Sequence, residues 1–76
     1  MAVSIYTTPT CGYCSLAKDY LRKRNIKFTE YNVAQDPLKA EEMVRKSGQM
    51  GVPVLDINGK IIVGFNQSEI ERALSH

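Results

Sequence analysis

Two cysteines separated by two residues, Cys11 and Cys14, are the side chains of this sequence best suited to chemistry. Cys11 follows a short apolar strand pattern and precedes a helical pattern, so its sulfur is expected where a helix begins. The first backbone N–H groups of a helix lack internal partners and carry partial positive charge, which favours a thiolate there. An exposed thiolate attacks disulfides, and a second thiol one turn along the helix can attack the mixed disulfide that forms. The spacing therefore predicts a pair that cycles between dithiol and disulfide.

The same pair has two other possible uses, structural cross-linking and metal binding. A disulfide that closes so short a loop gives little chain-entropy stabilisation, and a reducing cytosol keeps cysteines as thiols. A structural zinc site needs four ligands, and the sequence adds only His76 to the two thiolates. We therefore expect a catalytic pair and no zinc site within one chain.

Length and composition indicate one small globular domain, residues 1–76. The chain has 76 residues, 43% of them hydrophobic, and no low-complexity or linker-like stretch. A formal net charge of +2 is too small to indicate nucleic-acid binding. The N-terminus lacks the basic and apolar segments of a signal peptide, and no apolar run is long enough to span a membrane. We expect a cytoplasmic monomer with no nucleic-acid or membrane partner.

Turn and cap residues divide the chain into seven elements. Strands are predicted at Val3–Thr7, 27–33, Val54–Ile57 and Lys60–Val63, and helices at 12–24, 37–47 and from 67 onward. Asp36 before Pro37 is typical of a helix N-terminus, and Asn66 is a good N-cap for the last helix. Asn58-Gly59 favours a type I′ turn, which makes the last two strands a hairpin.

The order of elements is therefore β-α-β-α-β-β-α. A right-handed β-α-β unit makes the first two strands parallel, and the hairpin adds an antiparallel pair. The expected fold is an α/β domain in which a four-stranded mixed sheet carries helices on both faces. A C-x-x-C beside a β-α-β pattern in a cytosolic protein indicates a thioredoxin-like redox site.

Three features at fixed places in this order form a more specific pattern. They are Thr10-Cys11-Gly12-Tyr13-Cys14, the Val52-Pro53 pair before the hairpin, and Gly64 just before the last helix. With the order of elements, they resemble the glutaredoxin family, including the small glutaredoxin-like redoxins of bacteria and archaea. The likeness spans nearly the whole chain. It implies a thioredoxin-like (glutaredoxin) fold and a dithiol thiol-disulfide oxidoreductase.

The resemblance also implies roles for individual residues. Matched to the family motif, Cys11 is the nucleophile, Cys14 the resolving thiol, and Tyr13 an aromatic wall beside the sulfur. Tyr13 is equally well explained as an ordinary half-exposed aromatic residue. The family holds the proline at Pro53 cis and packed against the sulfur, which leaves the Val52 N–H and C=O free to pair with an extended substrate backbone. A proline that merely starts the third strand would need no ligand.

Glutathione is the usual partner of this family, and the resemblance implies it as a co-substrate. Gly64 matches the glycine that lets the chain approach the γ-glutamyl end, and the N–H groups of Gln67 and Ser68 can hold its carboxylate at the helix N-terminus. Three positions that carry charge in many or some relatives are uncharged here: Asn66, Thr8 and Gln49. Each lost charge-assisted contact costs on the order of 1.5 to 3 kcal/mol if well formed, so weak glutathione binding is expected. Asn66 is also sufficiently explained as a helix cap.

The expected reaction begins when Cys11 attacks a protein disulfide or a glutathione mixed disulfide. Cys14 then releases the reduced product and leaves a Cys11–Cys14 disulfide, which a second reductant restores to the dithiol. Glutathione is the favoured reductant. The alternative is a flavin reductase, which would make the chain a thioredoxin-reductase-dependent redoxin that donates electrons to ribonucleotide reductase or another dedicated enzyme.

A lesser alternative is cluster binding. Gly12 replaces the proline of the commonest dithiol motif of the family. Some relatives without that proline hold a 2Fe–2S cluster between two subunits, with glutathione supplying the other thiolates. Apart from this alternative, no tightly bound cofactor is expected.

Overall fold

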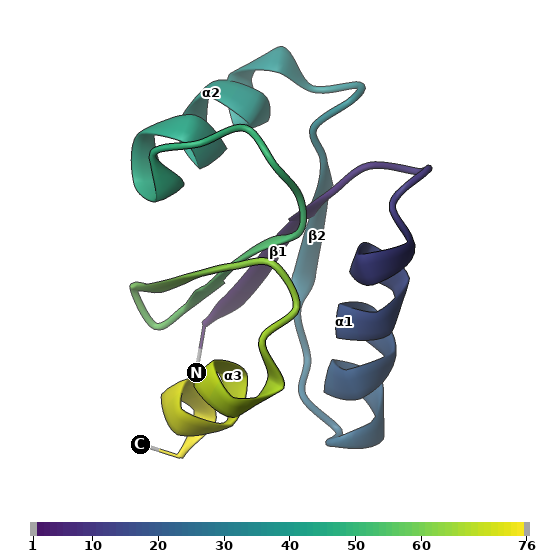
Figure 1. The fold of residues 1–76 in the computed structure, drawn as a ribbon, viewed down its shortest axis with the longest axis vertical. Helices are drawn as coiled ribbons and strands as arrows, with labels where there is room; N and C mark the ends of the chain where they lie inside the picture. Colours follow the sequence, from purple (N-terminus) through teal and green to yellow (C-terminus); the bar gives the residue numbers. More distant parts are fainter. Residues whose placement is uncertain (1, 76) are drawn as a thin grey trace.

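The order of elements is the one that the sequence predicts (Figure 1). The computed structural model describes residues 2–75 and contains β1 (Val3–Thr7), α1 (Gly12–Lys23), β2 (Thr29–Asn32), α2 (Pro37–Ser47), β3 (Val54–Ile57), β4 (Lys60–Val63) and α3 (Gln67–Leu74). Within this part of the chain, no helix has both the length and the apolar character needed to cross a membrane.

The four strands form one mixed sheet in the order β2-β1-β3-β4. β1 runs parallel to β2, with Ser4 opposite Thr29, and the two are connected by a crossover through α1. β3 pairs antiparallel with both β1 and β4. The predicted four-stranded mixed sheet is confirmed.

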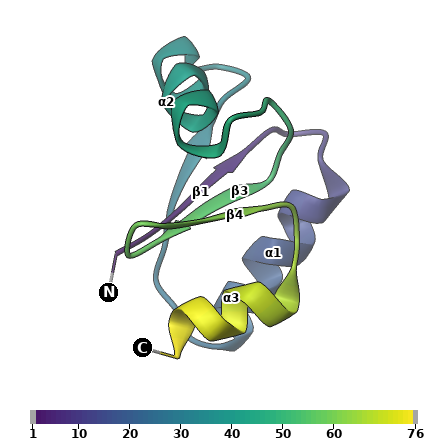
Figure 2. The ribbon, with the colours of Figure 1, turned by 60° about the vertical axis from the view of Figure 1, so that its left-hand side comes forward.

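Different helices cover the two faces of the sheet, with α2 on one side and α1 and α3 on the other (Figure 2). Successive side chains of a strand point to opposite faces, so β1 contributes to two hydrophobic clusters. Ile5 packs in the larger cluster with Leu21 of α1 and Ile70 of α3. Tyr6, its neighbour in sequence, packs in the smaller cluster with Met43 of α2. The alternation in β1 therefore holds helices on both faces, as predicted.

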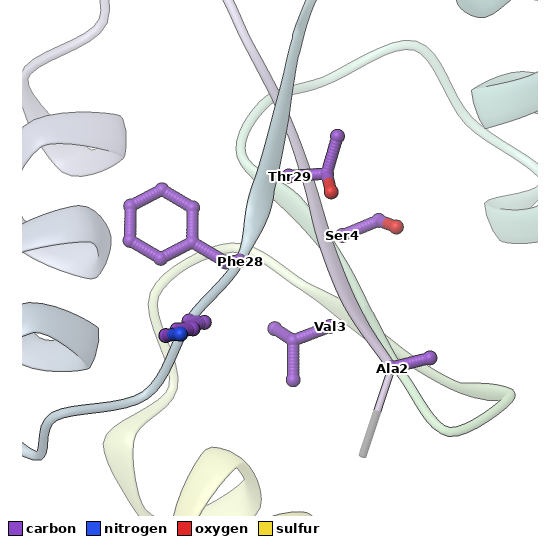
Figure 3. Close-up of a pocket in the computed structure, with 6 residues that line it drawn as sticks. Ala2, Val3, Ser4, Phe28 and Thr29 are labelled. Atoms are coloured by element: carbon purple, nitrogen blue, oxygen red, sulfur yellow. The ribbon is translucent and has the colours of Figure 1, made fainter.

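The second strand is shorter than the predicted 27–33, because its parallel ladder begins only at Thr29. Near that point, two segments of the chain border an open hollow of about 270 Å³, lined by Ala2, Val3, Ser4, Lys27, Phe28 and Thr29 (Figure 3). The Phe28 side chain packs against the larger core cluster. At the other end, the Val33 N–H still bonds to the Thr7 carbonyl at 2.9 Å, but β1 offers no further partner. This hollow lies at the start of β1, away from the cysteines that follow its other end.

Local hydrogen bonds explain where α2 and the hairpin begin and end. Asp36 Oδ1 accepts a hydrogen bond from the Lys39 N–H at 3.2 Å, which caps α2 as predicted. The helix stops at Gly48, whose φ of 76° is in the left-handed region that glycine adopts without a Cβ clash. In the hairpin, Asn58 and Gly59 have φ values of 53° and 91°, as a type I′ turn requires.

Candidate active site

Cys11 is the N-cap residue of α1 and ends the loop that follows β1. Its extended backbone turns the side chain back over the first helical turn, where Sγ accepts a hydrogen bond from the Cys14 N–H at 3.2 Å. The same sulfur, as a thiol, donates to the Val52 carbonyl oxygen at 3.7 Å. It is only partly buried. An accessible sulfur with an N–H aimed at it at a helix N-terminus is the arrangement predicted for the nucleophile.

Cys14 occupies the opposite environment. It lies in the first turn of α1 and is only 1% exposed. Burial raises the pKa of the Cys14 thiol to about 11, and the hydrogen bond with Cys11 is the next largest contribution in the same direction. The Thr8 backbone and the Lys18 ammonium act in the other direction and lower this pKa. At neutral pH, Cys14 is therefore a protonated thiol held one turn from an accessible sulfur.

The Val52-Pro53 segment lies beside Cys11, and its peptide bond is cis. Pro53 is buried, and its carbonyl oxygen accepts a hydrogen bond from the Gly64 N–H at 2.8 Å. Gly64 has a φ of 79°, a conformation that favours glycine. Val52 precedes the first paired residue of β3, Val54, so its backbone lies before the sheet ladder. The structure thus brings Val52, Pro53 and Gly64 together beside Cys11.

The loop that leads to this segment is organised by one side chain, that of Gln49. Its Nε2 donates to the Gly51 carbonyl at 3.0 Å, and its Oε1 accepts from the Gly51 N–H at 2.5 Å. Nε2 also donates to Ser47 Oγ at 3.3 Å. The polar end of Gln49 is therefore engaged with its own loop.

The other predicted glutathione-binding residues lie at the start of α3. Asn66 Oδ1 caps the helix by accepting from the Glu69 N–H at 3.2 Å. Asn66, Gln67 and Ser68 are all exposed. They follow Gly64 by two to four residues, so the bond from Gly64 to Pro53 links this helix start to the cis segment. The cap that the sequence predicts for Asn66 is present.

The surface next to Cys11 is apolar. Tyr13 is 65% exposed and Leu16 is 50% exposed, and with Gly12 they line an open hollow of about 380 Å³. Met50, in the loop before the cis peptide, is 80% exposed. Tyr13 therefore lies on the surface that an approaching substrate would meet.

A charged cluster that includes Lys18, one helical turn after Cys14, was not expected from the sequence. Glu30 Oε2 accepts hydrogen bonds from Thr7 Oγ1 at 2.7 Å and from Lys18 Nζ at 3.0 Å. The hydrogen bond from Thr7 lowers the pKa of the Glu30 carboxyl, and the hydrogen bond from Lys18 is the next largest cause in the same direction. One sequence signal was available, because Lys18 follows Cys14 by four residues and so lies on the same side of the helix.

Residues 2–75 contain no group of three or more His, Cys, Asp or Glu side chains that could hold a metal ion. The histidine considered as a zinc ligand, His76, lies outside the described residues.

A family model for glutaredoxin matches residues 3–62, which include the C-x-x-C, the cis segment and most of the hairpin. The chain belongs to the glutaredoxin family. Its thioredoxin-like fold and its cysteine pair are those of this family. The matched range includes Cys11, Cys14, Val52 and Pro53, and it ends before Gly64 and the start of α3.

Individual glutaredoxin-family relatives are similar over most of their lengths. The chain is 50% identical to an uncharacterised glutaredoxin-like 8.6 kDa protein in the rubredoxin operon of Clostridium pasteurianum, over 95% of this chain and 96% of that protein. It is 39% identical to glutaredoxin 3 of Escherichia coli strain K12, over 82% of this chain and 75% of that protein. The structure of the glutaredoxin-like protein NrdH-redoxin from Escherichia coli superposes with a TM-score of 0.83 at 30% identity, over 95% of this chain and 93% of that one.

Proposed function

We propose that this glutaredoxin-family protein reduces protein disulfides and glutathione mixed disulfides through Cys11 and Cys14. The observation that carries the proposal is the hydrogen bond from the Cys14 N–H to Cys11 Sγ at 3.2 Å, at the N-terminus of α1. It directs a helix-end donor at an accessible sulfur, and such a donor stabilises the thiolate that attacks a disulfide.

The reaction proceeds in two exchanges. The Cys11 thiolate attacks one sulfur of the substrate disulfide, a Cys11–substrate bond forms, and the first substrate thiolate leaves and takes up a proton. Cys14 then loses its proton and attacks Cys11 Sγ, which breaks the bond to the substrate and releases the second thiol. Two electrons have then passed to the substrate, and the protein holds a Cys11–Cys14 disulfide.

The backbone of Val52 is suited to hold the substrate during these exchanges. Its carbonyl faces Cys11 Sγ at 3.7 Å, and the residue lies before the first ladder pair of β3. An extended substrate segment that pairs with Val52 would place its own disulfide next to the nucleophile. The exposed side chains of Tyr13 and Leu16 border the same approach.

Glutathione is our proposed reductant for the Cys11–Cys14 disulfide. The N–H groups at the start of α3, beginning at Gln67, offer a site for its γ-glutamyl carboxylate, and Gly64 lies beside the cis segment. Two observations favour a second candidate, a flavin disulfide reductase. Gln49 and Asn66 are uncharged, so neither supplies a charge-assisted contact for glutathione. Their side-chain amides are also engaged, Gln49 with its own loop and Asn66 with its own helix.

One comparison tests both candidates. The protein is supplied either with NADPH, glutathione and glutathione reductase, or with NADPH and thioredoxin reductase, and the reduction of a small mixed disulfide and of a protein disulfide is followed. We expect turnover of the mixed disulfide in the glutathione system, with none for Cys11→Ser. Turnover in the thioredoxin reductase system alone would assign the second reductant. Absence of turnover in both would contradict the proposed function.

A further inference from the structure

One helical turn after the buried Cys14, Lys18 belongs to a small charged cluster that joins three elements. Lys18 is on α1, Glu30 on β2 and Thr7 at the end of β1. Glu30 Oε2 is the shared acceptor, at 2.7 Å from Thr7 Oγ1 and 3.0 Å from Lys18 Nζ. The Lys18 side chain is 22% exposed, which is low for a lysine, whose side chain is seldom deeply buried without a partner.

The sheet register explains why these side chains meet. Glu30 is opposite Ile5 in the parallel ladder, and Thr7 is two residues from Ile5 on the same strand. Ile5, Thr7 and Glu30 therefore share one face, and that face is covered by α1. Lys18 follows Cys14 by one helical turn, so its ammonium group reaches the cluster from the side of the helix that carries the resolving thiol.

The second exchange of the proposed reaction requires a negative charge on the buried sulfur. Such a charge is costly away from water unless an opposite charge is near. The charged groups that face this region are Lys18 and Arg22 from α1 and Glu30 from β2. Arg22 is paired with Asp19 at the surface at 3.4 Å. Burial and the contact with Cys11 raise the pKa of Cys14, and the Thr8 backbone and the Lys18 ammonium lower it. Lys18 is the one cation among these groups.

We propose that Lys18 is a positioning residue for the resolving step: Glu30, itself fixed by Thr7, holds it one helical turn from Cys14, so that its ammonium group stabilises the Cys14 thiolate. The inference rests on the proposed function, because it concerns the second exchange of the same reaction. In that exchange the Cys14 proton leaves to solvent or to the departing thiolate. Cys14 Sγ bonds to Cys11 Sγ, and the bond from Cys11 to the substrate sulfur breaks. Lys18 keeps its proton throughout.

A stopped-flow reaction with the aromatic disulfide dithiobis-nitrobenzoate separates the two exchanges. The reduced protein releases one coloured thiolate when Cys11 attacks, in a phase whose rate depends on reagent concentration. It releases a second coloured thiolate when Cys14 resolves the mixed disulfide. The rate of this second phase does not depend on reagent concentration. Both phases are recorded between pH 6 and 9.

The decisive variants are Lys18→Met and Glu30→Gln. We expect Lys18→Met to slow the second phase about five- to tenfold near neutral pH and to shift the pH dependence of that phase to higher pH. The rate of the first phase should stay within about twofold of wild type. Glu30→Gln removes the negative charge but keeps a side-chain oxygen that can accept from Lys18, so it should leave the second phase unchanged or faster. Lys18→Arg should retain the wild-type rate, and Lys23→Met, at an exposed lysine of the same helix, is the matched control.

Each other outcome has a definite meaning. Equal slowing of the second phase by Lys18→Met and Glu30→Gln would assign the cluster a structural role and overturn the inference. An unchanged second phase in Lys18→Met, with circular dichroism confirming the fold, would also overturn it. A wild-type first phase no faster than that of a free cysteine would instead contradict the proposed function, because the nucleophile itself would then be unactivated.

Discussion

The side-chain amide of Gln49 pairs with both backbone groups of Gly51, in the manner of one strand residue bonded to another. Oε1 accepts from the Gly51 N–H at 2.5 Å and Nε2 donates to the Gly51 carbonyl at 3.0 Å. A Cβ atom on residue 51 would lie 2.6 Å from Gln49 Oε1, which is closer than real Cβ contacts. The absence of a side chain at Gly51 is what lets the amide approach, and Val52 follows directly.

Gly51→Ala is therefore expected to expel the Gln49 amide from its place. The displaced group is the end of a flexible side chain, so the cost is the loss of the paired hydrogen bonds rather than a backbone clash, about 1 kcal/mol of unfolding free energy. Because Val52 loses a fixed neighbour, kcat/KM for a protein disulfide should fall about three- to tenfold. Urea unfolding and the coupled reductase assay measure the two effects.

A double-mutant cycle separates this explanation from a general effect of alanine. Gln49→Ala should cause a similar loss to Gly51→Ala, and the double variant should lose little more than either one. Additive losses would contradict the idea that the two substitutions break the same interaction.

Asn66 allows the cap and the ligand roles of one residue to be separated. Asn66→Asp keeps an oxygen for the Glu69 N–H, so stability should stay close to wild type, whereas Asn66→Ala should lose about 1 kcal/mol. If glutathione binds at the start of α3, the new carboxylate can pair with the ammonium of its γ-glutamyl group and should raise glutathione-coupled turnover. Thermal unfolding and the glutathione reductase assay provide the two readouts. Turnover unaffected by Asn66→Asp would limit Asn66 to the capping role.

Cys14→Ser should stop the proposed reaction after its first exchange. Cys11 keeps its partner in this variant, because the donor to its sulfur is the backbone N–H of residue 14 and not the side chain. A protein disulfide substrate should then remain attached to Cys11 and be detected as a covalent adduct by mass spectrometry. The matched variant Cys11→Ser should form no adduct at neutral pH, since burial keeps the remaining thiol protonated and inaccessible. An adduct on Cys14 in that variant would reverse the assignment of the two roles.

The local features of the fold could be predicted from the sequence because each depends on neighbouring residues. The caps at Asp36 and Asn66, the stop at Gly48 and the Asn58-Gly59 turn are set within a few residues of chain. The cis peptide at Pro53 could not be derived from spacing, since most such bonds are trans, and was expected from the family resemblance alone.

The cluster of Thr7, Lys18 and Glu30 could not be predicted from the sequence for a different reason. Thr7 and Glu30 are 23 residues apart, and they meet because the ladder places Ile5 opposite Glu30. A shift of the register by one residue would turn Glu30 to the other face of the sheet. The predicted strand 27–33 did not specify that register. The burial of Cys14, by contrast, follows from its place among the apolar residues on one face of α1, which also include Ala17 and Leu21.

Glu42, which bonds to Tyr6 on the other face of the sheet, is expected to make the stability of the protein depend on pH in acid. The hydrogen bond from Tyr6 and the Lys39 ammonium lower the pKa of the Glu42 carboxyl, against the opposing effect of burial. A carboxyl with a depressed folded-state pKa contributes stability that is complete above its unfolded pKa, about 4.3, and is lost as pH falls through the folded value. The free energy of unfolding should therefore fall below about pH 5. Glu42→Gln should be less stable than wild type at pH 7 and show a weaker decline in acid, which urea unfolding between pH 3 and 7 measures. Glu41→Gln removes an exposed carboxyl from the same helix and is the control. An acid decline as steep in Glu42→Gln as in wild type would mean that the bond between Tyr6 and Glu42 contributes nothing to folding.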